Sequence, residues 1–109
     1  MTEHEKQRCG ERAQVLKALA HPTRLWMVEQ LSTGERCVCE FVNEIEADFS
    51  TISRHLSLLK TAGIITDEKR GRQVIYRLVV PCILNFMDCV EAVLKERSRA
   101  LTFVMQEKQ

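Results

Sequence analysis

Cys37 and Cys39 are the residues of this sequence whose type and spacing most directly suggest chemistry. Thiolates are soft ligands, so a pair of them favours trivalent arsenic, cadmium or lead over magnesium or manganese. Residues two apart on a regular helix point in roughly opposite directions, so both thiols can bind one ion only if this first turn is extended or unwinds. We expect a metal site at this pair, against the alternative of two small apolar residues at a helix start.

Three further cysteines, Cys9, Cys82 and Cys89, are candidates for a third ligand or a second site. Cys9 lies near the start of a predicted helix, where it is either a donor or a packed residue of the apolar stripe. Cys82 and Cys89 are seven apart, and they are either buried residues of a dimer interface or ligands of a second soft-metal site. An odd total of five cysteines favours ligands over a disulfide framework.

The cysteine pair begins a segment typical of a helix-turn-helix, with a first helix over residues 38–44 and a recognition helix over about 50–62. Asp48 or Ser50 can cap the second helix, because a side-chain oxygen there accepts hydrogen bonds from unpaired backbone N–H groups. Gly63 ends it. The second helix of such a unit enters the DNA major groove.

The remaining elements complete a mainly α fold with a two-stranded β-wing. Helices are predicted over about 5–20 and 22–31, two strands over about 64–78, and a last helix over about 82–105. The apolar stripe of the last helix is too long for one small domain to cover, which indicates a partner helix from a second identical chain. Residues 1–109 form one domain, dimerised through the first and last helices.

Charge is unevenly distributed along a chain whose formal net charge is only +1. Residues 34–49 carry five acidic side chains against one arginine, whereas residues 50–78 carry six basic side chains against two acidic ones. A locally basic segment is the footprint of a DNA-binding protein. No apolar run is long enough to span a bilayer and the N-terminus has no signal-peptide region, so we expect a cytoplasmic protein with reduced thiols.

Candidate DNA contacts follow from this geometry. Arg54 is the best base reader, because a guanidinium can donate to guanine O6 and N7 together. The basic turn of the wing is placed for phosphate or minor-groove contact, with a solvated hairpin tip as the alternative. His55 is a polar residue of either the surface or the core edge. The candidates are Ser50, Thr51, Ser53, Arg54, His55, Ser57 and Lys60 on the helix, and Lys69, Arg70 and Arg72 in the wing.

The stretches LKALAHPTRLWMVEQL, ERCVCEF, STISRHLSLLKTAGII and RGRQVIYRL, in this order, resemble the ArsR/SmtB family of metal-responsive repressors. The resemblance covers nearly the whole chain and implies a dimeric winged helix-turn-helix. It also implies a homodimer that binds operator DNA and releases it when a metal or metalloid binds. The CVC tripeptide is similar to that of the subgroup that senses arsenite, antimonite, cadmium or lead, and arsenite or antimonite is the inducer we expect, with zinc a further possibility.

This sequence departs from the resemblance at two points. Many arsenite sensors of this kind have a third cysteine three residues after the pair, where this chain has Val42. Trivalent arsenic takes three thiolates, so the site is either completed by another group or by a donor from elsewhere. The zinc and nickel sensors place Asp and His ligands on the last helix, and this chain has no histidine after His55, so that site is missing.

Two other functions remain compatible with the sequence. A thiol redox switch on the same scaffold would oxidise Cys37 and Cys39, or another pair, and release DNA. A thiol metal chaperone would use the pair to pass on metal, but would leave the recognition helix and basic wing without a role. No nucleophile with its base and no phosphate-binding loop is present, so we do not expect an enzyme.

Overall fold

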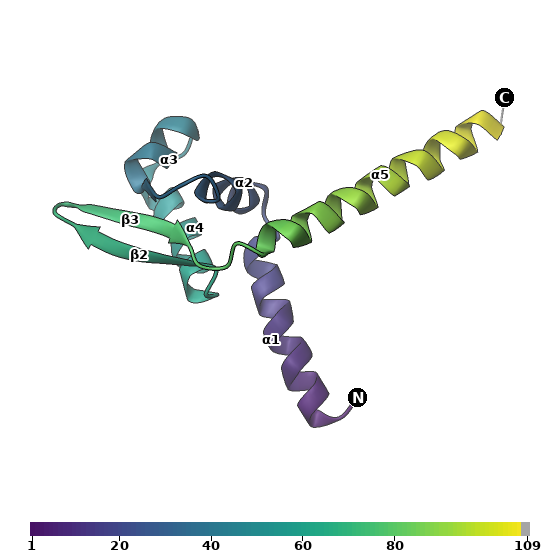
Figure 1. The fold of residues 1–109 in the computed structure, drawn as a ribbon, viewed down its shortest axis with the longest axis horizontal. Coiled ribbons are helices and arrows are strands. Elements are labelled where there is room, and N and C mark those ends of the chain that lie inside the picture. The colour runs from purple at the N-terminus through teal and green to yellow at the C-terminus, as the bar shows by residue number, and fades with distance from the viewer. Residues whose placement is uncertain (108–109) are drawn as a thin grey trace.

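The computed structural model describes residues 1–107 (Figure 1). It contains five helices and three strands, and its secondary structure is that of a winged helix-turn-helix. In chain order the elements are α1 (Glu3–Leu19), α2 (Pro22–Leu31), β1 (Arg36–Cys37), α3 (Val38–Glu44), α4 (Phe49–Thr61), β2 (Ile65–Arg70), β3 (Gln73–Leu78) and α5 (Ile83–Glu107).

The sheet confirms the predicted wing and adds one strand to it. Strands β2 and β3 form an antiparallel hairpin in which Ile65 lies opposite Leu78. Its connection is the dipeptide Gly71-Arg72, and Gly71 has a φ of +64°. A glycine with positive φ in first position is typical of a type II′ hairpin turn. The two-residue strand β1 pairs with the other edge of β3, giving the strand order β1-β3-β2.

The hydrophobic core is built where α2, α3, α4 and the start of β2 meet. Phe41 of α3 and Met27 of α2 are fully buried, and Ile52, Leu56 and Leu59 of α4 are buried with them. The remaining core residues come from the end of α1 and from the loops and strands that flank α4. This core comprises Ala18, Leu19, Met27, Val28, Leu31, Val38, Phe41, Ile52, Leu56, Leu59, Ile64 and Ile65.

The helix ends follow the capping rules that the sequence suggested. Asp48 caps α4, because its Oδ1 accepts a hydrogen bond from the backbone N–H of Thr51 at 2.8 Å. Gly63, with a φ of +85°, allows the chain to turn away after α4. At α2 the cap is a histidine: Nδ1 of His21 accepts from the backbone N–H of Thr23 at 3.1 Å.

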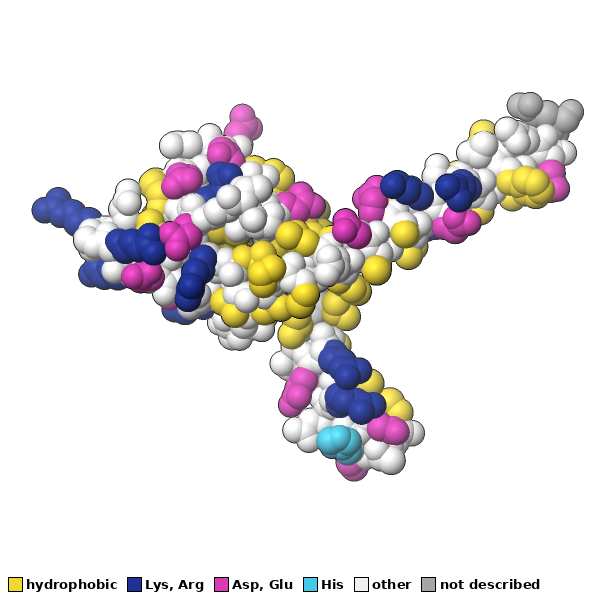
Figure 2. Space-filling model, in the orientation of Figure 1, with side chains coloured by type: hydrophobic (Ala, Val, Ile, Leu, Met, Phe, Trp, Pro, Cys, Tyr) yellow, Lys and Arg dark blue, Asp and Glu magenta, His cyan; other side chains and the backbone are white. Residues whose placement is uncertain are grey.

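Helices α1 and α5 leave this body as two diverging arms (Figure 1). No side chain of α5 is buried, and only Ala18 and Leu19 of α1 are. The radius of gyration is 17.8 Å, against roughly 13 Å for a compact chain of this length. Figure 2 shows hydrophobic side chains where the arms leave the body and cationic side chains at the far end of the hairpin. Within residues 1–107, no helix combines the length and apolarity needed to cross a membrane.

Candidate functional site

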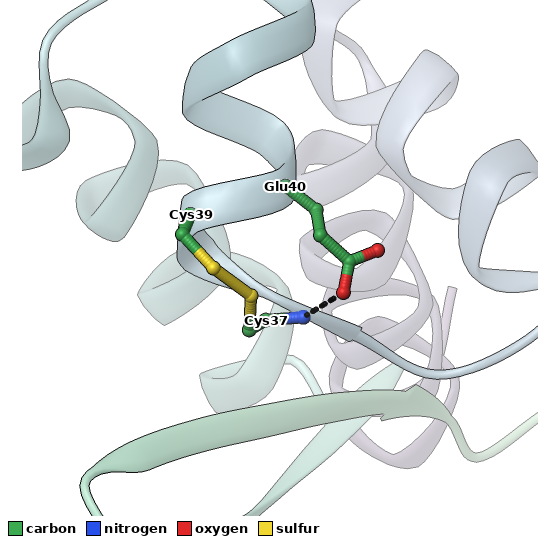
Figure 3. Close-up of a disulfide and its surroundings, with 3 residues drawn as sticks. All are labelled: Cys37, Cys39 and Glu40. Atoms are coloured by element: carbon green, nitrogen blue, oxygen red, sulfur yellow. Dashed lines mark hydrogen bonds between the residues drawn. A yellow bond between two sulfur atoms is a disulfide. The ribbon is translucent and has the colours of Figure 1, made fainter.

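Cys37 and Cys39 converge because Cys37 is not helical. It lies in β1 with extended φ and ψ of −89° and 168°, whereas Cys39 lies in the first turn of α3. Their Cα atoms are 5.4 Å apart and their sulfur atoms are joined in a disulfide (Figure 3). The extended first residue was the condition under which the sequence allowed both thiols to bind one ion, and the structure meets it.

The disulfide itself differs from the sequence-based expectation of free thiols. That expectation is wrong for Cys37 and Cys39 in this structure, because an extended residue followed by a helical turn brings the two sulfur atoms together. It holds for Cys9, Cys82 and Cys89, which are free and exposed. The pair is therefore closely spaced enough to form a disulfide, and its predicted role as a ligand set requires the reduced form, because the thiolate is the metal ligand.

Hydrogen bonds and strand pairing fix the position of the pair. The backbone N–H of Cys37 donates to Oε1 of Glu40 at 3.4 Å (Figure 3), and Cys37 lies opposite Ile75 of β3. The preceding Arg36 donates to the side chain of Glu44 at 3.1 Å and to the side chain of Gln30 at 3.2 Å. The pair is thus held between the wing sheet, α2 and α3.

The two cysteines line one side of a cavity of about 190 Å³ between α3 and the wing. Cys37 is 4% exposed, whereas Cys39 is exposed, so the pair is approached from one side. The cavity is largely apolar, and the only charged side chain among its lining residues is Arg72. Those residues are Cys37, Val38, Cys39, Phe49, Arg72, Gln73 and Val74.

Sequence reasoning did not find Phe49 and Val74 as neighbours of the thiols. Phe49 is the first residue of α4 and is 63% exposed, which is unusual for a large apolar side chain between the polar residues Asp48 and Ser50. The one signal available in the sequence was the position of an aromatic residue between Asp48 and Ser50. Val74 had no signal, because its place depends on how β3 pairs with β1.

No third donor joins the pair among residues 1–107 of one chain. No group of three or more His, Cys, Asp or Glu side chains among residues 1–107 has a metal-binding arrangement. Val42, which takes the place of a third cysteine, packs against the core. Cys9 and Cys89 lie on the two arms, and Cys82 precedes α5 by one residue. Ligand roles for these three cysteines stay predictions that concern a dimer.

The start of α4 presents the predicted DNA-reading residues. The hydroxyl of Ser50 donates to Oδ1 of Asp48 at 3.0 Å, so Ser50 takes part in the cap. The hydrogen bonds from Thr51 and Ser50 lower the pKa of the Asp48 carboxyl. Arg54 is exposed one turn later. The exposed or half-buried positions Thr51, Ser53 and Ser57 share the polar side of this helix.

The predicted cationic contacts divide into paired and unpaired side chains. Lys60 forms an ion pair with Asp67 at 2.9 Å. Arg70 forms ion pairs with Glu35 at 2.7 Å and Glu68 at 2.9 Å, and these hydrogen bonds raise its pKa and lower that of Glu35. In the described part of the chain, the predicted contacts without an ion-pair partner are Arg54, Lys69 and Arg72.

His55 lies at the edge of the core, one of the two places expected for it. Its ring centroid is 4.6 Å from that of His21, and its Nδ1 is buried with no hydrogen-bond partner in residues 1–107. Burial lowers the pKa of His55, and the neighbouring His21, Arg24 and Arg54 lower it further. The ring of His55 on α4 therefore packs against His21 at the start of α2, and its contact with DNA stays a prediction.

The similarities of this chain to known proteins agree with this architecture. Residues 21–67 match the family described as "Bacterial regulatory protein, arsR family". The HTH-type transcriptional repressor SmtB of Mycobacterium tuberculosis is 45% identical over 65 residues, which cover 60% of this chain and 48% of that protein. This chain therefore spans about half the length of that relative.

Two further relatives cover different shares of their own lengths. The arsenical resistance operon repressor of Escherichia coli is 46% identical over 66 residues, covering 60% of this chain and 56% of that protein. An uncharacterized HTH-type transcriptional regulator of Methanocaldococcus jannaschii is 40% identical over 80 residues, covering 72% of this chain and 90% of that protein.

Two solved structures share the fold over most of the chain. One is a homodimeric winged helix-turn-helix DNA-binding domain from Mycobacterium bovis, a possible ArsR-family regulator, with a TM-score of 0.76 and 25% identity over 92% of this chain and 93% of that chain. The other is the transcriptional repressor BigR from Xylella fastidiosa, with a TM-score of 0.69 and 32% identity over 85% of this chain and 96% of that chain. These relatives are transcriptional regulators rather than enzymes.

Proposed function

Because this chain belongs to the ArsR family of bacterial regulatory proteins, we propose that it is a homodimeric transcriptional repressor that releases operator DNA when a soft metalloid binds Cys37 and Cys39. The protein acts in the cytoplasm, where the pair is a dithiol. Arsenite or antimonite is the inducer, with cadmium, lead or zinc as the alternative ions. The observation that carries the proposal is the convergence of the two sulfur atoms between α3 and the wing.

DNA binding rests on α4 and on the hairpin. The start of α4 enters the major groove, where the unpaired guanidinium of Arg54 reaches base edges. Lys69 and Arg72, which form no ion pair in residues 1–107, contact phosphates. Lys60 and Arg70 contribute less, because each must first leave a carboxylate.

The mechanism follows from the two elements that hold the thiols. Cys37 belongs to β1, which pairs with β3 of the wing, and Cys39 belongs to α3, which packs on α4. A ligand bonded to both sulfur atoms sets the distance and angle between these elements. A change in the first turn of α3 therefore reaches the recognition helix on one side and the wing on the other.

The energy required of this coupling is modest. Allosteric coupling is typically 1–3 kcal/mol, or about 5- to 150-fold in affinity. The two recognition helices of a dimer must match two half-sites at a fixed spacing. A small rearrangement in each protomer therefore contributes twice to the loss of DNA-binding free energy. Ligand binding at both pairs can therefore release the dimer even if each protomer contributes only the lower part of that range.

The test is ligand-induced release of the reduced protein from the DNA upstream of its own gene, followed by fluorescence anisotropy. Arsenite, antimonite, cadmium and zinc are compared on the wild type, on Cys37→Ser and on the matched control Cys89→Ser. We expect arsenite to release the wild type and Cys89→Ser, but not Cys37→Ser. Release of Cys37→Ser at the same arsenite concentration as the wild type would contradict the proposal.

A second function, a thiol redox switch, is favoured by one specific observation, the disulfide between Cys37 and Cys39. Oxidation would also fix the distance and angle between β1 and α3, through a direct bond between the two sulfur atoms. Release by peroxide with no response to any of the four ions would select this function. Release by both would mean that ion binding and oxidation each act on the dithiol to release DNA.

A further inference from the structure

We propose that Lys17 and Arg24 bind a phosphate group of the DNA backbone, in a cationic pocket that lies outside the recognition helix and the wing. This inference adds a contact that the sequence did not predict, and it rests on the proposed DNA-binding function. Three observations carry it: the lining of the pocket, the unpaired charge of its two basic side chains, and its place beside the exposed stripe of α4.

The pocket lies where α1, α2 and α4 meet and has a volume of about 260 Å³. The charged residues of its lining are both cationic, Lys17 from the last turn of α1 and Arg24 from the first turn of α2. Gln14 and Thr61 add hydrogen-bonding side chains to the lining. No acidic side chain of the described residues lines it, so its composition suits an anion with oxygen acceptors.

The two cations of the pocket are not neutralised by the protein. Neither Lys17 nor Arg24 forms an ion pair within residues 1–107. In the same residues, Nε of Arg24 is buried without a hydrogen-bond partner, which is unfavourable for a donor. A guanidinium that turns toward a phosphate in the pocket gains both a partner for this donor and a compensating charge.

The pocket continues the exposed stripe of the recognition helix. Arg54, Leu58 and Thr61 are spaced i, i+4 and i+7 on α4, and residues with this spacing share one face of a helix. Arg54 is the predicted base reader, whereas Leu58 and Thr61 line the pocket. The walls of the major groove are sugar–phosphate backbone, so a duplex that receives the start of α4 presents backbone phosphates to this pocket.

A backbone phosphate suits the pocket better than a small free anion. Lys17 is exposed and Arg24 is half-buried, so the site is open to solvent and holds a free anion only weakly. The contact between α4 and the groove presents the backbone to the pocket at a high effective concentration, which a free anion lacks. Each protomer of the dimer therefore binds one phosphate next to its half-site.

The experiment measures the affinity of the full-length protein for the DNA upstream of its own gene, by anisotropy at several salt concentrations. Lys17→Gln is compared with the wild type and with Lys95→Gln, which removes the same charge from an exposed position of α5. For Lys17→Gln we expect the slope of log affinity against log salt to be less steep by about 0.9 per protomer, with a loss of affinity on the order of tenfold. Lys95→Gln should match the wild type.

Two further readouts identify the lost contact as one to phosphate. A phosphate carries no sequence information, so Lys17→Gln should lose as much affinity on a random duplex as on the operator, unlike Arg54→Ala. Methylphosphonate replacement of single backbone phosphates then locates the partner. Neutralising that phosphate should weaken the wild type on the order of tenfold and Lys17→Gln little further, because the two changes remove the same contact.

Arg24 is tested with a conservative variant because its side chain is half-buried. Arg24→Gln should flatten the salt dependence as Lys17→Gln does, whereas Arg24→Lys keeps the charge and should restore most of it. Circular dichroism and sedimentation equilibrium show whether each variant folds and dimerises. Should Arg24→Gln fail to fold, the exposed Lys17 still decides the question.

The outcomes separate this inference from the proposed function. A salt slope and affinity of Lys17→Gln equal to those of the wild type would overturn the phosphate site, while operator binding by the wild type would leave the proposed function standing. Wild-type protein that binds neither duplex would overturn both. Inorganic phosphate is the probe for a free anion: if it raises the melting temperature of the wild type but not of Lys17→Gln, and the salt slopes are equal, the pocket holds a free anion and the inference fails.

Discussion

The body of the molecule, from α2 to β3, and its two arms, α1 and α5, solve the problem of burying apolar side chains in different ways. Phe41 in the body is fully buried, whereas Leu101 in the stripe of α5 is 67% exposed. The body has its own core, while the arms display an apolar surface that a single chain does not cover. The body therefore buries its apolar side chains within one chain, whereas the arms need a second chain to cover theirs.

This difference assigns the two halves of the proposed mechanism to different parts of the chain. Cys37 and Cys39 lie on β1 and α3, and the DNA contacts predicted from the sequence lie on α4 and the β2–β3 hairpin. All of them therefore belong to the body. The spacing of two recognition helices depends on how the arms pair. A ligand bound in the body can therefore act on DNA directly through α4 and the wing, without first passing a signal through α5.

The largest effect is expected from a change in the core of the body. Phe41→Ala removes a fully buried aromatic side chain, and should lower the free energy of unfolding by about 3–5 kcal/mol. Its counterpart on an arm, Phe103→Ala, removes a side chain that is 62% exposed, and should change it by less than about 0.5 kcal/mol. Urea denaturation measures both, and equal losses would contradict the division into body and arms.

A charge on the arm should break the dimer while leaving the body folded. Leu94→Glu places a carboxylate in the apolar groove between α1 and α5, where burial without a partner is costly. We expect the dimer dissociation constant to rise about 100-fold, which corresponds to about 2.7 kcal/mol. Ala92→Glu, on the opposite side of α5, is the matched control. Sedimentation equilibrium gives both constants, and a dimer that tolerates Leu94→Glu would exclude this stripe as the interface.

Within the body, predicted DNA contacts without an ion-pair partner should contribute more to operator binding than those held in ion pairs. Arg54→Ala should weaken operator binding by about 1–3 kcal/mol and relax the preference for one base pair. Arg70→Ala should cost less, because Arg70 is held by Glu35 and Glu68. Anisotropy titrations at several salt concentrations distinguish the two effects. A larger loss for Arg70→Ala would show that this side chain leaves its carboxylates on DNA.

The smallest effect concerns acid stability at the junction of α2 and α4. The pKa of His55 is lowered by burial, and then by His21, Arg24 and Arg54. The unfolded chain takes up a proton at this histidine below about pH 6.5, whereas the folded chain resists it, so stability falls as the pH drops through that value. His55→Gln should flatten this part of the pH profile of unfolding. An unchanged slope between pH 7 and pH 5 would assign the loss to other groups.

The sequence predicted the elements of the body well because each has a strong local signal. Pro22 marks the start of α2, and the spacing of Ile52, Leu56 and Leu59 gives the buried side of α4. Strand β1 could not be predicted, because two residues have no periodicity. The sequence left the pairing of Cys37 with Cys39 only as an alternative to free thiols for the same reason, since the pairing depends on Cys37 belonging to that strand.

Tertiary contacts account for the rest of what the sequence did not reveal. The cavity beside the thiols depends on where Phe49 and Val74 meet, and nothing in their spacing indicates it. The ion pair between Glu35 and Arg70 joins residues that are 35 positions apart, through the register of the hairpin. Composition could show that residues 50–78 are basic, but not which of those charges are already neutralised.

The central claim is that the dithiol and the DNA-binding surface are coupled, and one measurement tests it most directly. The affinity of the reduced protein for an arsenical is determined by calorimetry with and without saturating operator DNA, and the affinity for DNA with and without the arsenical. Thermodynamic linkage requires both ratios to be equal, and we predict a weakening of about 5- to 150-fold in each. An arsenical affinity that is the same on free and DNA-bound protein would contradict the account, whatever residues bind the ligand.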